Sequence, residues 1–497
     1  MRDKSGLRTA VLVVVGVLVA LVPAPVGAAG DQRLREFHHQ RPTWSTCDFD
    51  ARLQCASIAV PLDYSRPRGE RLSIAISRLR TSDPHRRRGA LLSVNGGPDG
   101  KGGGLGRALP LRYAGTAVQR VYDLIGMDAR GNGASSPLSC EVTQARARFD
   151  SRPSDEAFAT ITEDMRRSEE ACDRAGGDRR AFFTTANSAR DVDVIRAVLR
   201  EQRLSFVGYA YGSFLGAVYG TMFGHRLDRH VFDSVRNPEW SWRQQFMAQA
   251  VAIRQNVDKW AAWVGERDRR FGLGTSGTEV VASVEAVAAK LAVTPVNGLD
   301  RTAFDGAMGM ASARPRWTEL ADLVRGLRAG APAASPSLTA ESAEPPAALR
   351  PGTLEAVTCE GLDGWPTDLN TYYRDMRTFR DHNPYGYGVT RAQPWVCAFR
   401  NFDAPARLPQ VRRTGFATGV VVQAEGDPLT HYDGGPAMAG RLHDPLITVA
   451  DDGSNEVFGV RGNTCVDRLV TRYLVDGVLP PARVTCAGMP RPDVPKD

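Results

Sequence analysis

The fold of this chain is decided by the stretch Leu204-Ser205-Phe206-Val207-Gly208-Tyr209-Ala210-Tyr211-Gly212-Ser213. The apolar run Leu204–Val207 predicts a buried strand, and the stretch then continues into a helix. A glycine on each side of one central residue is typical of a sharp strand-to-helix turn, because small neighbours let the central side chain rise above the sheet edge. In the pattern G-x-S-x-G the central residue is a nucleophilic serine. Here it is Ala210, and a methyl group cannot attack a carbonyl.

Strands and helices alternate along the chain up to about Arg236. Alternating polarity predicts a half-buried strand over Leu72–Leu79, and short apolar runs predict buried strands over Ala90–Val94 and Leu124–Met127. Helical spacing of apolar residues predicts a helix over Asn187–Leu199. Strands that alternate with helices favour a mostly parallel sheet with helices on both faces, so the predicted fold class is α/β.

A different pattern follows, in which long helical stretches such as Trp242–Val264 and Val280–Leu291 dominate. An Ala/Pro/Ser-rich stretch, Gly330–Pro351, predicts a flexible loop. Strand signals return at Thr418–Ala424 and Leu446–Val449, and a last helix is expected after Cys465. We therefore divide the chain into a signal peptide (1–29), the first part of an α/β core (30–236), a helical lid insertion (237–407) and the last part of the core (408–497).

The first residues have the composition of an export signal. Basic residues precede an apolar stretch, Ala10–Val22, and small residues follow it up to Ala29. The apolar stretch is shorter than the ~20 residues that a spanning helix needs. We expect cleavage near Ala29 and a secreted, extracellular protein with no stable membrane span. A membrane anchor that is never cleaved is the alternative.

The cysteines agree with export, because disulfides persist in oxidising compartments. They form four neighbouring couples, and sequential pairing would close short loops, although the sequence alone does not fix the connectivity. Zinc binding is the competing interpretation, and no CxxC or Cys/His cluster supports it. We expect four disulfides, no metal and no cofactor. The couples are Cys47/Cys55, Cys140/Cys172, Cys359/Cys397 and Cys465/Cys486.

The composition is that of a globular protein, with 42% hydrophobic and 24% charged residues. The net charge is +7, and basic residues are interspersed with acidic ones along the chain. Nucleic-acid binding needs a basic run or a basic patch interleaved with aromatic residues, and the sequence has neither. We therefore expect no nucleic-acid partner.

Several short segments together carry a resemblance to a known family. The chain resembles the secreted α/β-hydrolases of actinobacterial tripeptidyl-aminopeptidase type over nearly its whole length after the leader. The resemblance implies an α/β-hydrolase fold with a helical lid, a Ser-Asp-His triad and a TAP-like C-terminal block. The segments that carry it are Val60-Pro61-Leu62-Asp63-Tyr64, Gly96-Gly97-Pro98, Asp128-Ala129-Arg130-Gly131-Asn132-Gly133, Glu425-Gly426-Asp427-Pro428, Val457-Phe458-Gly459 and Cys465-Val466-Asp467-Arg468.

Carried over residue by residue, the triad is incomplete. Ala210 occupies the position of the nucleophile and Asp427 that of the acid, which is intact. The family's histidine precedes Val457-Phe458-Gly459, and here Asn455 stands in its place. Asparagine cannot act as a general base near neutral pH. Glu456 lies next to the lost base and is either a displaced carboxylate base or an ordinary solvated loop residue.

The oxyanion loop also departs from the family. Gly96 and Gly97 are kept, but Asp99 and Lys101 replace small residues at the mouth of the pocket. A lysine there could polarise a carbonyl and an aspartate could transfer a proton, or the two could form an exposed ion pair. Further substrate-binding candidates are Tyr209 and Tyr211 beside the elbow and Glu360 in the lid, which would face a substrate ammonium group or be a surface carboxylate.

Three hypotheses follow. The leading one is an enzyme repurposed for non-hydrolytic chemistry, such as addition, cyclisation or carbon–carbon bond formation on a bulky secondary metabolite. The second is a pseudo-peptidase that binds and sequesters a small molecule or short peptide in the lidded pocket. The third is a tripeptidyl-aminopeptidase-like serine hydrolase that has been inactivated by substitution.

Overall fold

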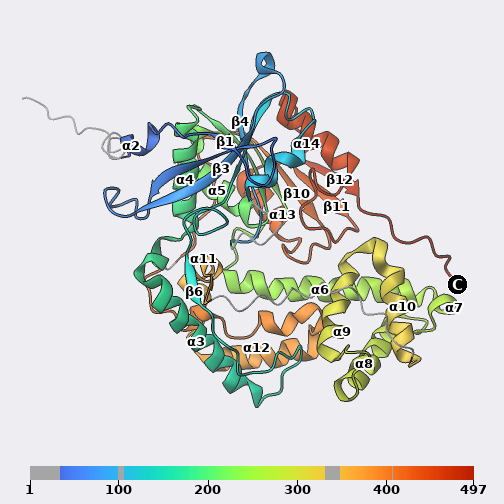
Figure 1. Ribbon diagram of the computed structural model, residues 1–497. Helices are drawn as coiled ribbons and strands as arrows, with labels where there is room; N and C mark the ends of the chain where they lie inside the picture. Colours follow the sequence, from blue (N-terminus) through green and yellow to red (C-terminus); the bar gives the residue numbers. More distant parts are fainter. Residues whose placement is uncertain (1–33, 99–105, 331–347, 406) are drawn as a thin grey trace, which may run out of the picture.

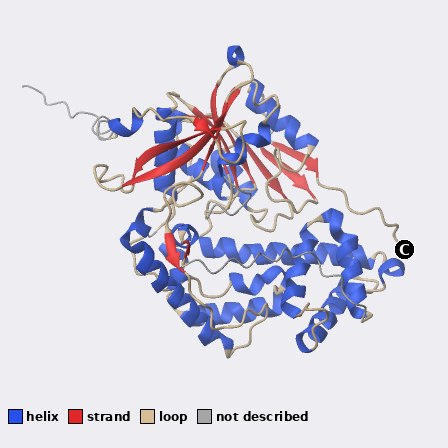
Figure 2. Ribbon diagram, in the orientation of Figure 1, coloured by secondary structure: helices blue, strands red, loops and turns tan. Residues whose placement is uncertain are grey.

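The computed structural model describes residues 34–98, 106–330, 348–405 and 407–497. One large sheet carries the core (Figures 1 and 2). Its order is β1 (Ser45–Thr46), β2 (Gln54–Pro61), β3 (Arg71–Leu79), β5 (Tyr122–Met127), β4 (Gly89–Val94), β7 (Leu204–Tyr209), β8 (Leu227–Asp233), β10 (Val420–Ala424), β11 (Leu446–Ala450) and β12 (Arg483–Ala487).

The sheet is parallel from β5 to β12, and the first three strands run antiparallel to their neighbours. Successive residues of the central strands point to opposite faces: Phe206 packs into one apolar cluster and Val207 into another. Helices α4 (Thr185–Val198), α5 (Tyr211–Phe223) and α13 (Gly434–Leu442) cover the first face, and α14 (Thr464–Asp476) covers the second. This is the α/β-hydrolase fold expected from the sequence, and the strands and helices predicted for the core are confirmed.

A helical layer lies beyond the ends of the parallel strands and forms the lower half of Figure 1. Its longest helix, α6 (Trp242–Gly265), begins with a complete capping box in which the side chains of Ser241 and Gln244 bond each other's backbone N–H. The layer has an apolar cluster of its own, centred on Trp260 and Trp317. Its other main helices are α7 (Asp268–Phe271), α8 (Gly277–Val293), α9 (Arg301–Ala307), α10 (Trp317–Arg328), α11 (Thr353–Thr358) and α12 (Leu369–His382).

Two segments join this layer in ways that the sequence analysis did not predict. Helix α3 (Ala157–Gly176) and strand β6 (Ser139–Glu141), which we had placed with the core, lie in the helical layer (Figure 1). Strand β6 pairs antiparallel with β9 (Leu349–Pro351). The end of the predicted flexible stretch Gly330–Pro351 is therefore a strand, because it has a partner far away in the chain. Residues 331–347 lie outside the described part.

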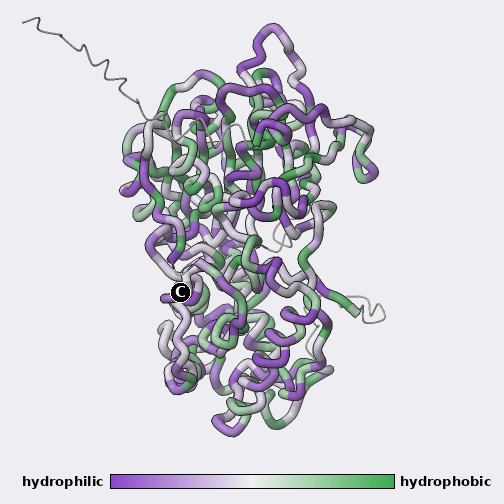
Figure 3. Tube along the Cα trace, turned by 90° about the vertical axis from the view of Figure 1, so that its left-hand side faces the viewer, coloured by the Kyte–Doolittle hydropathy of each residue, from purple (hydrophilic) through white to green (hydrophobic). Residues whose placement is uncertain are grey.

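The C-terminal segment connects the two layers. After β12 the chain runs down to the helical layer and ends beside α7 (Figure 1). There the Asp497 carboxylate accepts the backbone N–H of Arg269 at 2.9 Å, and the Lys496 ammonium lies 3.0 Å from Glu266. Figure 3 shows the same two layers from the side, one above the other.

All four predicted cysteine couples are disulfides: Cys47–Cys55, Cys140–Cys172, Cys359–Cys397 and Cys465–Cys486. Among the described residues, no helix is both long and apolar enough to cross a bilayer. The predicted signal peptide lies outside the described residues.

Candidate functional site

The turn between β7 and α5 keeps the geometry of a nucleophile elbow. Ala210 has φ 48° and ψ −115°, a strained backbone conformation that costs about 1–3 kcal/mol for a residue with a side chain. A Cβ on Gly208 would lie 2.4 Å from the Gly212 carbonyl oxygen, and one on Gly212 would lie 2.3 Å from that of Val94. Both glycines are therefore needed for the close contacts around the turn. The turn is intact, and it presents a methyl group.

The acid of the expected triad lies in the loop after β10. The carboxylate of Asp427 is fully buried and accepts the backbone N–H groups of Leu429 and Thr430, both at 2.9 Å, and the Thr430 hydroxyl at 2.6 Å. Burial raises the pKa of Asp427 to about 6, although these hydrogen bonds favour its charged form.

Asn455 fills the place beside this acid. Its Nδ2 atom lies 3.2 and 2.9 Å from the two carboxylate oxygens of Asp427 and 3.1 Å from the Thr430 hydroxyl. The amide thus donates to the acid as the N–H of a triad histidine would, but it offers no basic nitrogen. The structure brings Asn455 and Asp427 together, and the correspondence of Asn455 to the family's histidine stays a prediction.

Glu456 lies next to the elbow and is held by an arginine. A Cβ built on Gly96 would come within 2.6 Å of the Ala210 methyl group and 3.6 Å of the Glu456 carboxylate, so these three residues converge. The carboxylate pairs with the Arg112 guanidinium at 2.8 Å. Arg112 in turn lies over the ring of Tyr209, 4.7 Å from its centre.

Asp233, at the end of β8, holds the loop that carries Asn455 and Glu456. Its buried carboxylate accepts the backbone N–H groups of Val457 and Phe458, at 3.0 and 2.6 Å. Burial raises the pKa of this carboxyl to about 7. Sequence analysis missed Asp233, which ends a strand that it did not predict.

Ala210, Asn455 and Glu456 open onto one cavity of about 670 Å³ between the sheet and the helical layer. We call its two sides the core wall and the cap wall. The core wall consists of Gly96, Gly97, Pro98, Ala210, Tyr211, Arg236, Leu429, Thr430, Asn455, Glu456 and Arg461. The cap wall consists of Trp242, Gln245, Phe246, Gln249, Leu354, Trp365, Thr390, Arg391, Gln393 and Trp395.

The cap wall has a firmly held aromatic surface. The Phe246 ring lies 6.1 Å from both Trp365 and Trp395, measured between ring centres. Thr358, in α11, accepts both indole N–H groups, through its carbonyl at 2.8 Å from Trp365 and its hydroxyl at 2.9 Å from Trp395. A cavity of this size with a fixed aromatic wall and a few polar groups is typical of a small-molecule site.

Other predicted site residues fall in different places. Gly96, Gly97 and Tyr211 line the cavity. Tyr209 is fully buried, with its hydroxyl 2.8 Å from the Phe458 carbonyl, so it supports the elbow from beneath. Asp99 and Lys101 lie outside the described residues.

Glu360 is buried in the described structure rather than lining the cavity. Its carboxylate accepts the Thr185 N–H at the start of α4, and burial raises its pKa to about 8. The Arg236 guanidinium favours its charged form. Glu360 therefore joins the helical layer to the core, and a contact with substrate stays a prediction.

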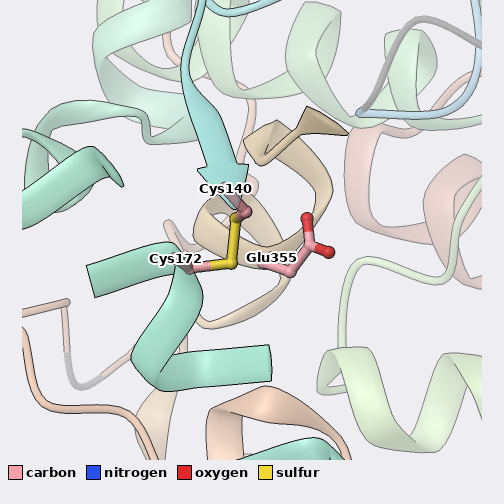
Figure 4. Close-up of side chains that lie close together, drawn as sticks. All are labelled: Cys140, Cys172 and Glu355. Carbon is pink, nitrogen blue, oxygen red and sulfur yellow. A yellow bond between two sulfur atoms is a disulfide. The ribbon is translucent and has the colours of Figure 1, made fainter. Parts of the chain in front are cut away.

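Within the described ranges, one group of potential metal ligands lies close together: Cys140, Cys172 and Glu355 (Figure 4). The two sulfur atoms are bonded to each other, so neither is a thiolate. Glu355 pairs with Arg350. The group therefore offers no free ligand set.

Comparison with known proteins agrees with this architecture. The α/β-hydrolase-fold family model matches residues 89–318, and the TAP-like protein model matches residues 383–486. The chain belongs to the α/β-hydrolases of tripeptidyl-aminopeptidase type. It is 34% identical to a tripeptidyl aminopeptidase of Streptomyces lividans, over 90% of this chain and 87% of the relative.

A more distant relative is the serine protease Hip1 of Mycobacterium tuberculosis, which is 28% identical over 87% of each chain. Among solved structures, a proline iminopeptidase of Mycobacterium smegmatis is similar, with 13% identity, a TM-score of 0.37 and coverage of 84% of this chain and 98% of that one. The fold assignment rests on the sheet order and the family models.

Proposed function

We propose that this chain is a binding member of its family, which holds a small molecule or a short peptide in the cavity and does not hydrolyse it by the serine mechanism. One observation carries the proposal. An intact elbow presents the methyl group of Ala210, and the side chain that donates to Asp427 is the amide of Asn455, at the position that the resemblance assigns to the base. Removing nucleophile and base lowers turnover by a factor of about 10⁶, whereas binding by the remaining pocket is unaffected in principle.

Hydrolysis of a panel of peptidyl and aminoacyl p-nitroanilides tests this proposal. The native chain is compared with Ala210→Ser, Asn455→His and the double variant. We expect saturable binding without turnover by the native chain, and turnover only when both residues are restored, because the serine needs a base. Turnover by the native chain would overturn the proposal. Rescue by Ala210→Ser alone would show that another base operates and would favour an inactivated hydrolase.

Non-hydrolytic chemistry is a second candidate, and the position of Glu456 favours it. Its carboxylate lies beside the elbow and is oriented by Arg112, so it could take a proton from one atom of a ligand and return it at another, as an addition or cyclisation requires. The test is deuterium uptake by a bound ligand in D₂O, followed by mass spectrometry. Uptake that is lost in Glu456→Gln would favour this candidate over simple binding.

We further propose that the chain acts outside the cell. Four disulfides suit an oxidising compartment, and the first 29 residues have the composition of a signal peptide. Recovery of a chain that begins near Ala29 from the culture medium would support export. Retention of the leader in the membrane fraction would contradict cleavage.

A further inference from the structure

An arginine in the cap wall has no counter-ion among the described residues. Arg391 ends the short helical segment η8 (Tyr385–Arg391) and lines the cavity. Its Nε atom is buried and has no hydrogen-bond acceptor within the described structure. Burial lowers the pKa of this guanidinium, and no carboxylate among the described residues opposes that effect. Arg391 is partly buried, and a partly desolvated charge without a partner has a cost that a ligand anion can remove.

The other arginines near the cavity donate hydrogen bonds within the protein, although Nη1 of Arg112 and Nε of Arg236 are buried without an acceptor among the described residues. Arg112 pairs with Glu456, and Arg461 donates to the Asn455 carbonyl at 2.9 Å. Arg236 lies against the rings of Phe214 and Trp242, at 4.5 and 4.6 Å, and donates to the Asn237 carbonyl. A charged Glu360 would favour the charged form of Arg236, but burial raises the pKa of Glu360 to about 8, so the neighbours of Arg236 near neutral pH are carbonyls and aromatic rings. Glu456, with its arginine already in place, is the one carboxylate in the described lining. Of the three arginines in the described lining, Arg391 is the one that donates no hydrogen bond to a described residue.

Two buried amide oxygens complete the pattern. Gln245 and Gln249 lie one turn apart on α6, and each donates its Nε2–H to the Leu429 carbonyl, at 3.1 and 2.9 Å. Their Oε1 atoms are buried and accept nothing from the described residues. Among the described residues, the cap wall therefore lacks an anion for Arg391 and N–H donors for the two glutamines. These unmet groups share the wall with the aromatic surface around Phe246.

We propose that the cavity binds an acidic, amide-containing ligand with an apolar body, of the class of N-acylated amino acids or short peptides, and that its carboxylate pairs with Arg391. The N–H groups of the ligand serve Gln245 and Gln249, and its apolar part packs on Phe246 and the two tryptophans beside it. The proposal rests on the proposed binding function and adds the charge of the ligand: an anion is selected over a neutral or cationic homologue.

Quenching of tryptophan fluorescence tests the charge preference, because Trp242, Trp365 and Trp395 line the cavity. The probes are N-acetylated amino acids with aromatic or aliphatic side chains, each as the free acid and as the neutral amide. We expect the full-length native chain to bind the acids about 10- to 100-fold more tightly than the amides, the range of a charged hydrogen bond. Arg391→Gln should abolish the difference, and Arg391→Lys should keep part of it.

A second measurement needs no ligand. Since Arg391 is a partly desolvated charge without a counter-ion among the described residues, Arg391→Met should raise the Tm of the free protein by about 1–3 °C. Arg236→Met is the matched control in the same cavity, and it should lower the Tm because Arg236 donates to a carbonyl and packs on two aromatic rings. A lower Tm in both variants would show that Arg391 is structurally satisfied, and would overturn the proposal.

The outcomes separate this inference from the proposed function. Equal binding of acid and amide, or no binding of any acid in the series, overturns the charge preference. Hydrolysis of a p-nitroanilide by the native chain overturns the binding function, yet the acid-against-amide ratio and its loss in Arg391→Gln still report on Arg391.

Discussion

The two walls of the cavity differ in how completely they satisfy their own polar groups. On the core wall, Thr430 and Asn455 donate hydrogen bonds to the buried Asp427 behind them, and Glu456 pairs with Arg112. Among the side-chain nitrogen and oxygen atoms of the described core wall, only Nε of Arg236 is buried without a hydrogen-bond partner. The cap wall has four such atoms, in Trp242, Gln245, Gln249 and Arg391.

The difference lies in hydrogen bonds that the protein makes for itself. On the described core wall, Ala210 offers no hydroxyl and the Asn455 amide no basic nitrogen, and the polar side chains mostly bond one another. The cap wall is incomplete on its own and gains hydrogen bonds only from an occupant. On the proposed binding function, the cap wall is therefore the side of the cavity that recognises the ligand.

The largest effect is expected from crowding the rigid core wall. In Gly212→Ala the new Cβ would lie 2.3 Å from the Val94 carbonyl oxygen, so β4 and α5 must move apart. We expect a loss of about 4 kcal/mol in the free energy of unfolding, measured by urea denaturation. Gly326→Ala, in α10 of the cap, is the control: no atom lies within 4 Å, and the helix should gain about 0.5–1 kcal/mol. A folded Gly212→Ala protein of native stability would contradict the view of the core wall as rigid.

A second prediction concerns Glu360, which joins the two layers. Its carboxyl keeps its proton up to about pH 8 in the folded chain, against a usual pKa of 4.5. Between these values the folded state binds more protons than the unfolded state, so the free energy of unfolding falls as the pH rises. Glu360→Gln removes this loss. The variant should therefore gain stability relative to the native chain from pH 5 to 8, by up to about 4 kcal/mol.

Urea midpoints at pH 5, 6.5 and 8 measure this gain. Glu279→Gln is the control, because the N–H and hydroxyl of Thr275 lower the pKa of Glu279 and place its titration below this range. The difference in urea midpoint between Glu279→Gln and the native chain should stay constant over the same three pH values. A constant difference for Glu360→Gln as well would mean that Glu360 is ionised throughout, and that Arg236 outweighs burial.

The local parts of the site could be predicted from the sequence, whereas the charge balance of the cap wall could not. The turn around Ala210 depends on two glycines within two residues of it, so a short stretch of sequence contains the whole signal. Asp427 and Asn455 were identified from the family resemblance, because the order of the family's motifs along the chain shows which loops carry the site. The fold then brings those loops together. Arg391 is notable for the carboxylate that it lacks, and only packing in three dimensions shows what lies beside a residue.

The same limit applies to β6 and β9. Each is a strand only because the other pairs with it across more than two hundred residues of chain, and the composition of Gly330–Pro351 masks that pairing. Hydrophobic periodicity can be recognised only in a segment long enough for the pattern of buried residues to repeat. Helices such as α6 and α8 meet that condition, and a three-residue ribbon does not.

The smallest expected effect is a change in the free energy of unfolding whose sign should differ between the two walls. Asn455→Ala removes one donor from Asp427 and leaves the N–H groups of Leu429 and Thr430 and the Thr430 hydroxyl in place. We expect a loss of about 1–2 kcal/mol in the free energy of unfolding, since one hydrogen bond to a buried charge is lost while others remain. Replacing Arg391 on the cap wall should instead raise the free energy of unfolding.

Asn455→Asp should lower the free energy of unfolding more than Asn455→Ala does, and more at pH 8 than at pH 4, because it sets a second carboxylate beside a buried one. A stabilised Asn455→Ala protein would mean that the core wall, too, holds groups that wait for a ligand, and the contrast between the walls would fail.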